Sequence, residues 1–103
     1  MTRVILESPY SGDAERNVEY ARLCLKDSLL RGEAPIASHL LYTQVLDDNK
    51  ESERTLGIEA GLAWASFADI HVFYVDYGMS AGMLYAMEQA TRNGENIEMR
   101  LIL

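Results

Sequence analysis

The run of residues 70–75 constrains the fold more than any other segment. It reads Ile-His-Val-Phe-Tyr-Val and lies in a predicted strand over 69–75 that shows no alternation of polar and apolar residues. A strand of this kind is buried on both faces, as in parallel sheets covered by helices. Further β-rich runs occupy 3–7, 34–38 and 97–103, and helical segments separate the four runs. The order βαβαβαβ therefore predicts an α/β domain with a parallel sheet.

The spacing of apolar residues predicts the helices between these runs. The first helix begins after an N-cap at Asp13 and ends at Gly32. Its apolar positions are Val18, Ala21, Leu25 and Leu29. Residues 39–50 lack a clear period and are predicted to form a loop with a helical turn around Tyr42. A second helix covers 51–66, where Gly57 and Gly61 allow a neighbour to approach closely. A third ends at Gly94.

The predicted strand order is 2-1-3-4, in one domain over 1–103. Helical connections between parallel strands cross over with a right hand, so helices cover both faces of the sheet in a three-layer sandwich. Ligands bind such sheets at the carboxyl ends of the strands, where the strand order reverses. Here that point lies between strands one and three, which are followed by two loops rich in Gly and Ser, 8–12 and 76–83.

These two loops and their neighbours supply the candidate ligand-binding residues. Gly residues and free N–H groups at helix starts suit phosphate, sugar or carboxylate groups. Tyr10 can stack on a base or bond a ribose, or can be a partly buried loop aromatic. The candidates are Ser8, Tyr10, Ser11, Gly12, Arg16, Asn17, His39, Asp76, Gly78, Met79, Ser80, Gly82 and Met83.

Charge and cysteine content exclude several classes of partner. The formal net charge of −7 argues against a nucleic-acid polymer or an anionic membrane surface, although it is compatible with a small anionic ligand. The single Cys24 removes any disulfide framework and any cysteine-based zinc site. The acidic stretch 47–54 lacks the Gly and distal Glu of a calcium loop, so no metal and no cofactor is expected. No signal peptide or membrane span is recognised, which predicts the cytoplasm.

The order and spacing of several motifs resemble a known superfamily. The Ser-Pro-Tyr loop, Gly61-Leu62-Ala63-Trp64, Ala68-Asp69-Ile70 and Asp76-Tyr77-Gly78 followed by Gly82, Tyr85 and Ala86 resemble the core of the nucleoside 2-deoxyribosyltransferase-like superfamily. The likeness covers nearly the whole chain and is greatest to small phage and bacterial members. It implies a flavodoxin-like fold, a homodimer or larger homo-oligomer, and a nucleoside or nucleotide ligand whose base stacks near the first loop.

The resemblance also implies an enzymatic mechanism that this chain departs from. Catalytic members use a Glu nucleophile six residues after the loop Asp, and here that position is Gly82. Asp76 remains as a catalytic candidate, or as a cap for the turn that follows it. A non-catalytic binder, for example a phage protein that sequesters a nucleotide signal in the host cytoplasm, is therefore the first hypothesis. An N-glycoside hydrolase or deoxyribosyltransferase is the alternative, and an interaction module is a third class.

Overall fold

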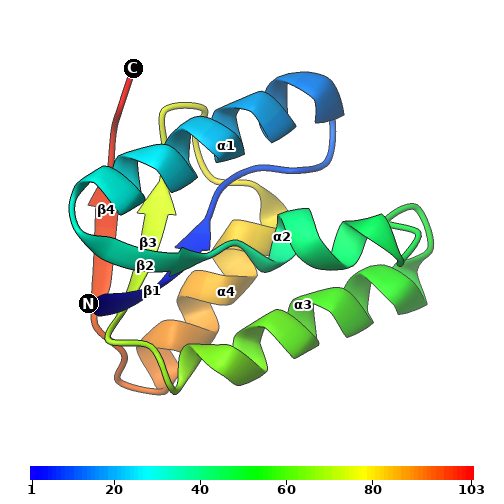
Figure 1. Ribbon diagram of the computed structural model, residues 1–103. Coiled ribbons are helices and arrows are strands. Elements are labelled where there is room, and N and C mark those ends of the chain that lie inside the picture. The colour runs from blue at the N-terminus through cyan, green and yellow to red at the C-terminus, as the bar shows by residue number, and fades with distance from the viewer.

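Four parallel strands form the centre of the molecule. The structure, a computed structural model, describes residues 1–103 and orders the strands β2-β1-β3-β4, which confirms the predicted topology (Figure 1). The strands are β1 (Thr2–Glu7), β2 (Glu33–Ile36), β3 (Ile70–Tyr74) and β4 (Ile97–Arg100). The architecture is that of a flavodoxin- or Rossmann-like α/β fold.

The helices cover the two faces of the sheet unequally. They are α1 (Ala14–Leu30), α2 (Ser38–Leu41), the 3-10 turn η1 (Tyr42–Gln44), α3 (Glu51–Ala65) and α4 (Ala81–Arg92). The helix α1 leads from β1 outward to β2 and lies on one face. The helices α3 and α4 lead in the opposite direction along the sheet, so right-handed crossovers place both on the other face (Figure 1).

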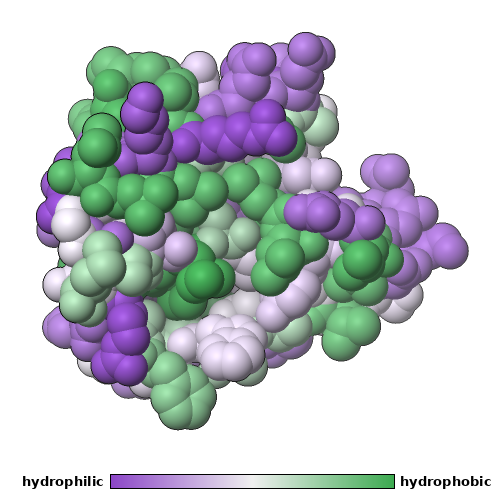
Figure 2. All heavy atoms as spheres, viewed as in Figure 1, coloured by the Kyte–Doolittle hydropathy of each residue, from purple (hydrophilic) through white to green (hydrophobic).

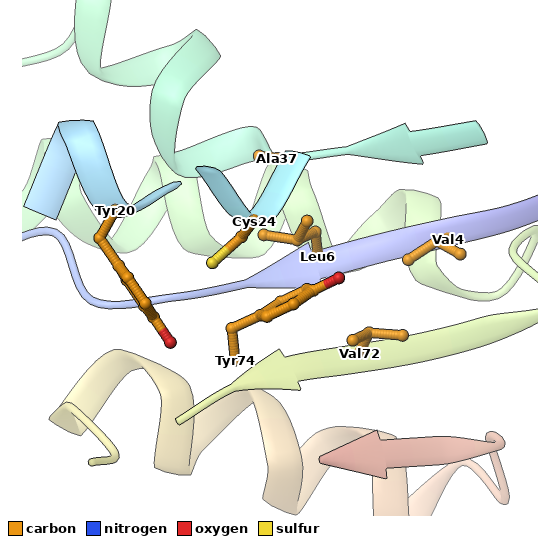
Figure 3. Close-up of a cluster of buried hydrophobic side chains, with 7 residues drawn as sticks. All are labelled: Val4, Leu6, Tyr20, Cys24, Ala37, Val72 and Tyr74. Atoms are coloured by element: carbon orange, nitrogen blue, oxygen red, sulfur yellow. The ribbon is translucent and has the colours of Figure 1, made fainter. Parts of the chain in front are cut away.

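The larger core lies between α1 and the sheet. Tyr20 and Cys24 of α1 point toward Leu6, Val72 and Tyr74 of the two central strands (Figure 3). The buried stripe of α1 includes Tyr20, Ala21, Cys24 and Ser28, whereas the predicted position Leu29 is exposed. The predicted apolar face was therefore rotated by about one residue, because the Tyr20 ring and the Cys24 thiol supply the contacts with the sheet.

A smaller core lies on the opposite face. Phe73, Met83 and Ala86 are buried there, and Leu62 of α3 packs against them. Gly61 brings α2 onto α3, since a Cβ atom at this position would overlap the Ser38 hydroxyl and lie 2.9 Å from the Ser38 Cβ atom. The predicted close approach at Gly61 is thus confirmed, and its consequence is that α2 is held beside α3.

The ends of the elements differ from the predictions at three places. The strand β2 ends at Ile36, because the chain turns into α2 at Ser38, and His39 therefore lies on a helix. The strand β4 ends at Arg100 rather than at residue 103. Its neighbour β3 ends at Tyr74, and the Asp76 carboxylate accepts hydrogen bonds from the backbone amides of Ile102 and Leu103. A side chain thus replaces the strand partner at the C-terminus.

The helix caps agree with the sequence at α1 and differ at α4. The Asp13 side chain accepts a hydrogen bond from the Arg16 backbone amide, and Gly32 adopts φ +83° just beyond the helix. At α4 the N-cap is Ser80, whose hydroxyl accepts from the Met83 amide at 3.2 Å. The predicted capping role of Asp76 is therefore wrong.

Candidate functional site

A cavity opens at the carboxyl edge of the sheet, on the face that carries α3 and α4. The loop after β1, the α2–η1 segment, α3 and the start of α4 form its walls. It spans about 750 Å³ with its open mouth included. Tyr10 and Ser80, from segments seventy residues apart, both line it, so the two predicted loops do meet around one hollow.

The loop after β1 is held in shape by Asn17. This buried side chain donates hydrogen bonds from Nδ2 to the carbonyl oxygens of Tyr10 and Ser11, at 3.1 and 3.0 Å. Tyr10 and Ser11 line the cavity, but Asn17 does not. Asn17 therefore positions the loop from behind and leaves the loop side chains free to face a ligand.

A serine and a histidine form a hydrogen-bonded pair on the cavity wall. The Ser8 hydroxyl lies 2.7 Å from Nε2 of His39, which comes from α2. Burial lowers the pKa of His39, and the nearby Glu7 carboxylate offsets this only in part, so the ring is neutral at pH 7. Its other nitrogen, Nδ1, is buried without a hydrogen-bond partner. Depending on which ring nitrogen of His39 carries the hydrogen, Nε2 either accepts a hydrogen bond from the Ser8 hydroxyl or donates one to it.

Glu7 brings a carboxylate to the same wall from the end of β1. Its Oε1 atom lies 3.0 Å from Nε2 of His71, and Nδ1 of His71 lies 3.0 Å from Oε1 of Glu95. Burial lowers the pKa of His71, but the hydrogen bonds and charges of the two carboxylates outweigh burial and raise it. A protonated ring donates through both nitrogens, which fixes the orientation of Glu7.

The first two turns of α3 provide the polar end of the cavity. Glu53 and Arg54 line it together with Asp48 from the preceding loop. Glu53 is engaged by Lys50 at 3.7 Å and by the Asp47 amide at 3.1 Å. Arg54 forms neither an ion pair nor a side-chain hydrogen bond. In Figure 2, hydrophilic side chains gather at the right-hand end, over the loop that leads into α3.

The helix α4 and the second half of α3 provide an apolar end. Met83 and Ala86 are buried there, and Ile58 and Leu62 line the same space from α3. A Cβ atom at Gly82 would lie 3.9 Å from Cδ1 of Ile58, an ordinary contact distance. The cavity thus changes along its length from charged to apolar, and Gly82 keeps the space beside Ile58 open.

Just over half of the predicted site residues lie on this cavity. Those that line it are Ser8, Tyr10, Ser11, His39, Ser80, Gly82 and Met83. Those that lie away from it are Gly12, Arg16, Asn17, Asp76, Gly78 and Met79. Met79 packs against the smaller core instead, and Gly12 and Gly78 supply turns with φ +97° and +80°. Whether the lining residues bind a ligand stays a prediction.

Asp76 needs the largest correction, because it was the catalytic candidate. Its carboxylate accepts a hydrogen bond from the Tyr20 hydroxyl at 2.5 Å and two more from the amides of Ile102 and Leu103. Partial burial raises the pKa of Asp76, but these donated hydrogen bonds outweigh it and lower the pKa overall. Asp76 is thus an ionised acceptor that ties β3 to α1 and to the C-terminus, away from the cavity.

Arg16 is also placed away from the cavity. Its guanidinium carbon lies 4.1 Å from the centre of the Tyr77 ring, and its Nη2 atom donates to Oδ1 of Asn17 at 3.1 Å. Arg16 therefore does not line this cavity, and its predicted contact with a phosphate stays a prediction. The guanidinium group is used in a cation–π contact that joins α1 to the loop after β3.

Sequence reasoning missed Glu7, Arg54 and the η1 residue Thr43. Glu7 is the last residue of β1, and its position before the Ser-Pro-Tyr loop was a usable signal for a side chain at the carboxyl edge. Arg54 lies in an acidic stretch that was interpreted as solvated. No local pattern distinguishes Arg54, because its place on the cavity follows from the packing of α3 beside α2.

The fold and the cavity define a flavodoxin-like α/β domain with a candidate small-molecule site at the carboxyl edge of its sheet. A family model described as "Domain of unknown function (DUF7768)" matches residues 2–100, and the chain belongs to this family. No curated protein matches the sequence. None of the helices combines the length and the apolar character needed to cross a bilayer. The resemblance to the nucleoside 2-deoxyribosyltransferase-like superfamily stays a prediction.

Proposed function

We propose that this protein binds a nucleoside- or nucleotide-type ligand in the cavity between the loop after β1 and the start of α4, without converting it. One observation carries the proposal. A single hollow combines hydrogen-bonding groups, among them Ser8 and His39, with a buried apolar end at Met83 and Ala86. Such a combination suits a ligand that has a polar part and a flat, weakly polar ring. A cytoplasmic role in sequestering a nucleotide signal, in a phage-infected host if the chain is phage-encoded, belongs to the same proposal.

A variant that fills the cavity tests the proposal. We expect Gly82→Leu to abolish binding, because the added side chain extends past Ile58 into the hollow. Gly82→Ala is the matched control, since its Cβ atom fits at ordinary contact distance. Isothermal titration calorimetry with adenosine, thymidine and their 5′-monophosphates measures the affinities. The proposal fails if none of these probes binds the natural protein, or if Gly82→Leu binds as the natural protein does.

One observation favours N-glycoside hydrolysis or transfer as a second candidate function. Glu7 places a carboxyl group on the cavity wall, and cleavage of an N-glycosidic bond by the superfamily's route requires a carboxylate nucleophile. Incubation with the same probes, followed by chromatography, separates the two functions. Release of free base that Glu7→Gln abolishes would support the enzyme, whereas intact probe recovered after heat denaturation would support the binder.

The homo-oligomer is likewise a proposal. Trp64 and Phe67, at the end of α3 and just beyond it, are 60% and 66% exposed, and Leu56 is exposed earlier on the same helix. Large apolar side chains in water favour burial against another chain. Sedimentation equilibrium of the natural protein and of Trp64→Glu tests this, and a monomer in both cases would contradict it.

A further inference from the structure

Arg54 differs from the other cations of the chain. Six of the nine Lys and Arg residues are engaged by ion pairs or, for Arg16, by Tyr77 and Asn17. The other three are Arg22, Lys26 and Arg54. Arg22 and Lys26 are exposed to solvent, whereas Arg54 is half-buried on the wall of the cavity. It is therefore the one cation that is both partly removed from water and left without a protein partner.

The surroundings of Arg54 leave its guanidinium group available. Glu53, its neighbour in sequence, is taken by Lys50 and by the Asp47 amide. Asp48 lines the same end of the cavity and forms no ion pair with Arg54. A guanidinium group carries five N–H donors in a planar fork that matches a carboxylate or a phosphate. In a chain with a net charge of −7, a half-buried guanidinium without a carboxylate partner is an unusual feature.

The position of Arg54 along the cavity gives the ligand a direction. Arg54 lies near the N-terminus of α3, and Leu62 lies eight residues further along the helix, which corresponds to about 12 Å. Leu62, Met83 and Ala86 form the apolar end. The N-terminus of α3 lies at the polar end, so the dipole of this helix adds positive potential there.

We propose that Arg54 binds the anionic group of the ligand, so that the cavity selects a nucleoside monophosphate, or another nucleoside with a carboxylate or phosphate at one end, over the neutral nucleoside. This inference rests on the proposed function and adds the ligand's charge to it. The anion lies at the Arg54 end and the ring lies against Leu62 and Met83.

The test compares one nucleoside in three forms: uncharged, with a 5′-phosphate and with a 5′-carboxylate. For the natural protein we expect the phosphate form to bind about tenfold more tightly than the uncharged form, or more, because hydrogen bonds to a charged group are strong. In Arg54→Gln we expect this preference to disappear while the affinity for the uncharged form is kept. The carboxylate form shows whether the site takes any oxyanion or phosphate only.

Two variants provide matched controls. Arg22→Gln removes a cation that is exposed and away from the cavity, and it should leave the preference unchanged. Asp48→Asn removes a negative charge from the Arg54 end, and it should strengthen binding of the phosphate form. Because Arg54 has no protein partner, Arg54→Gln should keep the midpoint of urea unfolding, which separates a binding defect from a folding defect.

The outcomes distinguish this inference from the proposed function. If the uncharged and phosphate forms bind equally well, or if Arg54→Gln keeps the preference, the inference is overturned and the proposed function stands. If no nucleoside form binds, the proposed function fails. In that case inorganic phosphate alone tests whether Arg54 binds an anion. It should raise the melting temperature of the natural protein and not that of Arg54→Gln. Equal shifts in both proteins would overturn the inference.

Discussion

The two faces of the sheet treat their polar groups in different ways. On the α1 face, Arg100 donates to both carboxylate oxygens of Glu33 at 2.7 Å and to the Tyr74 hydroxyl at 3.1 Å. The Tyr74 hydroxyl in turn donates to Asp27 at 2.7 Å, and Ser28 donates to Glu33 at 2.7 Å. Every charge in this network meets an opposite charge or a donor. The face is closed, and its polar groups serve stability.

The α3 and α4 face pairs His71 with Glu7 and Glu95 but leaves two polar groups open at the cavity. The Arg54 guanidinium and Nδ1 of His39 have no protein partner, and both residues line the cavity. Of the two, His39 Nδ1 is fully buried, and a buried polar atom without a partner costs free energy that the fold does not recover by itself. The network on the α1 side therefore stabilises the fold. On the opposite side, a ligand can supply the hydrogen-bond partners that Arg54 and His39 lack.

The largest expected effect comes from opening the closed network. Arg100 is only 6% exposed, so Arg100→Ala leaves Glu33 without its partner in a partly buried site. We expect a loss of about 3 kcal/mol in the free energy of unfolding, measured by urea denaturation. Arg92→Ala, which breaks the exposed pair with Glu88, is the control and should cost about 0.5 kcal/mol or less. Equal losses in both variants would contradict the distinction between the faces.

The next effect comes from separating α2 from α3 on the open face. Gly61→Ala places a methyl group against Ser38, so we expect a loss of about 2 kcal/mol in stability and weaker ligand binding, because α2 carries His39. In Gly57→Ala the new methyl group meets the flexible end of Leu46 at 3.3 Å and the Tyr42 Cβ atom at an ordinary 3.9 Å. Urea unfolding of the two variants should therefore differ clearly, and identical midpoints would rule out the packing argument.

Asp76→Asn tests the difference between the two faces, because it should lower the stability of the protein and leave its affinity for the ligand unchanged. The variant removes the charge that accepts from Tyr20, Ile102 and Leu103, which we expect to cost about 1 kcal/mol. Gly82→Leu should show the reverse pattern, with stability kept and binding lost. Unfolding curves and calorimetric titrations of both variants provide the measurements. A binding defect in Asp76→Asn would place Asp76 in the site after all.

The smallest effect is a pH dependence from His71. Because the carboxylates of Glu7 and Glu95 raise its pKa in the folded protein, the protonated ring stabilises the fold fully below the ordinary pKa near 6.5. This contribution is lost as the pH rises through the raised folded pKa. We expect the urea midpoint of the natural protein to fall as the pH rises from about 6.5 through the raised folded pKa, and His71→Gln to lack this step. A natural protein without the step would show that His71 is neutral when folded.

Local patterns predicted most of the fold and part of the site. The uninterrupted run 70–75 indicated an inner parallel strand, and Asp13 and Gly32 marked the ends of α1 correctly. The reversal in strand order correctly placed Tyr10 and Ser80 around one hollow. The capping role predicted for Asp76 was wrong, and neither Arg16 nor Asp76 lines the cavity, because a charged residue gives no sign in the sequence of which partner will take its charge.

Sequence alone determined the elements, their order and the edge at which the cavity opens, because hydrophobic period, turn residues and crossover handedness act over short stretches of chain. Tertiary structure alone decided which polar groups are paired. The contacts Ser8–His39 and Glu7–His71 join residues 31 and 64 positions apart, and the unpaired state of Arg54 depends on which carboxylates the packing of α3 brings near it. Charges interact through distances in space, and only the folded chain sets those distances.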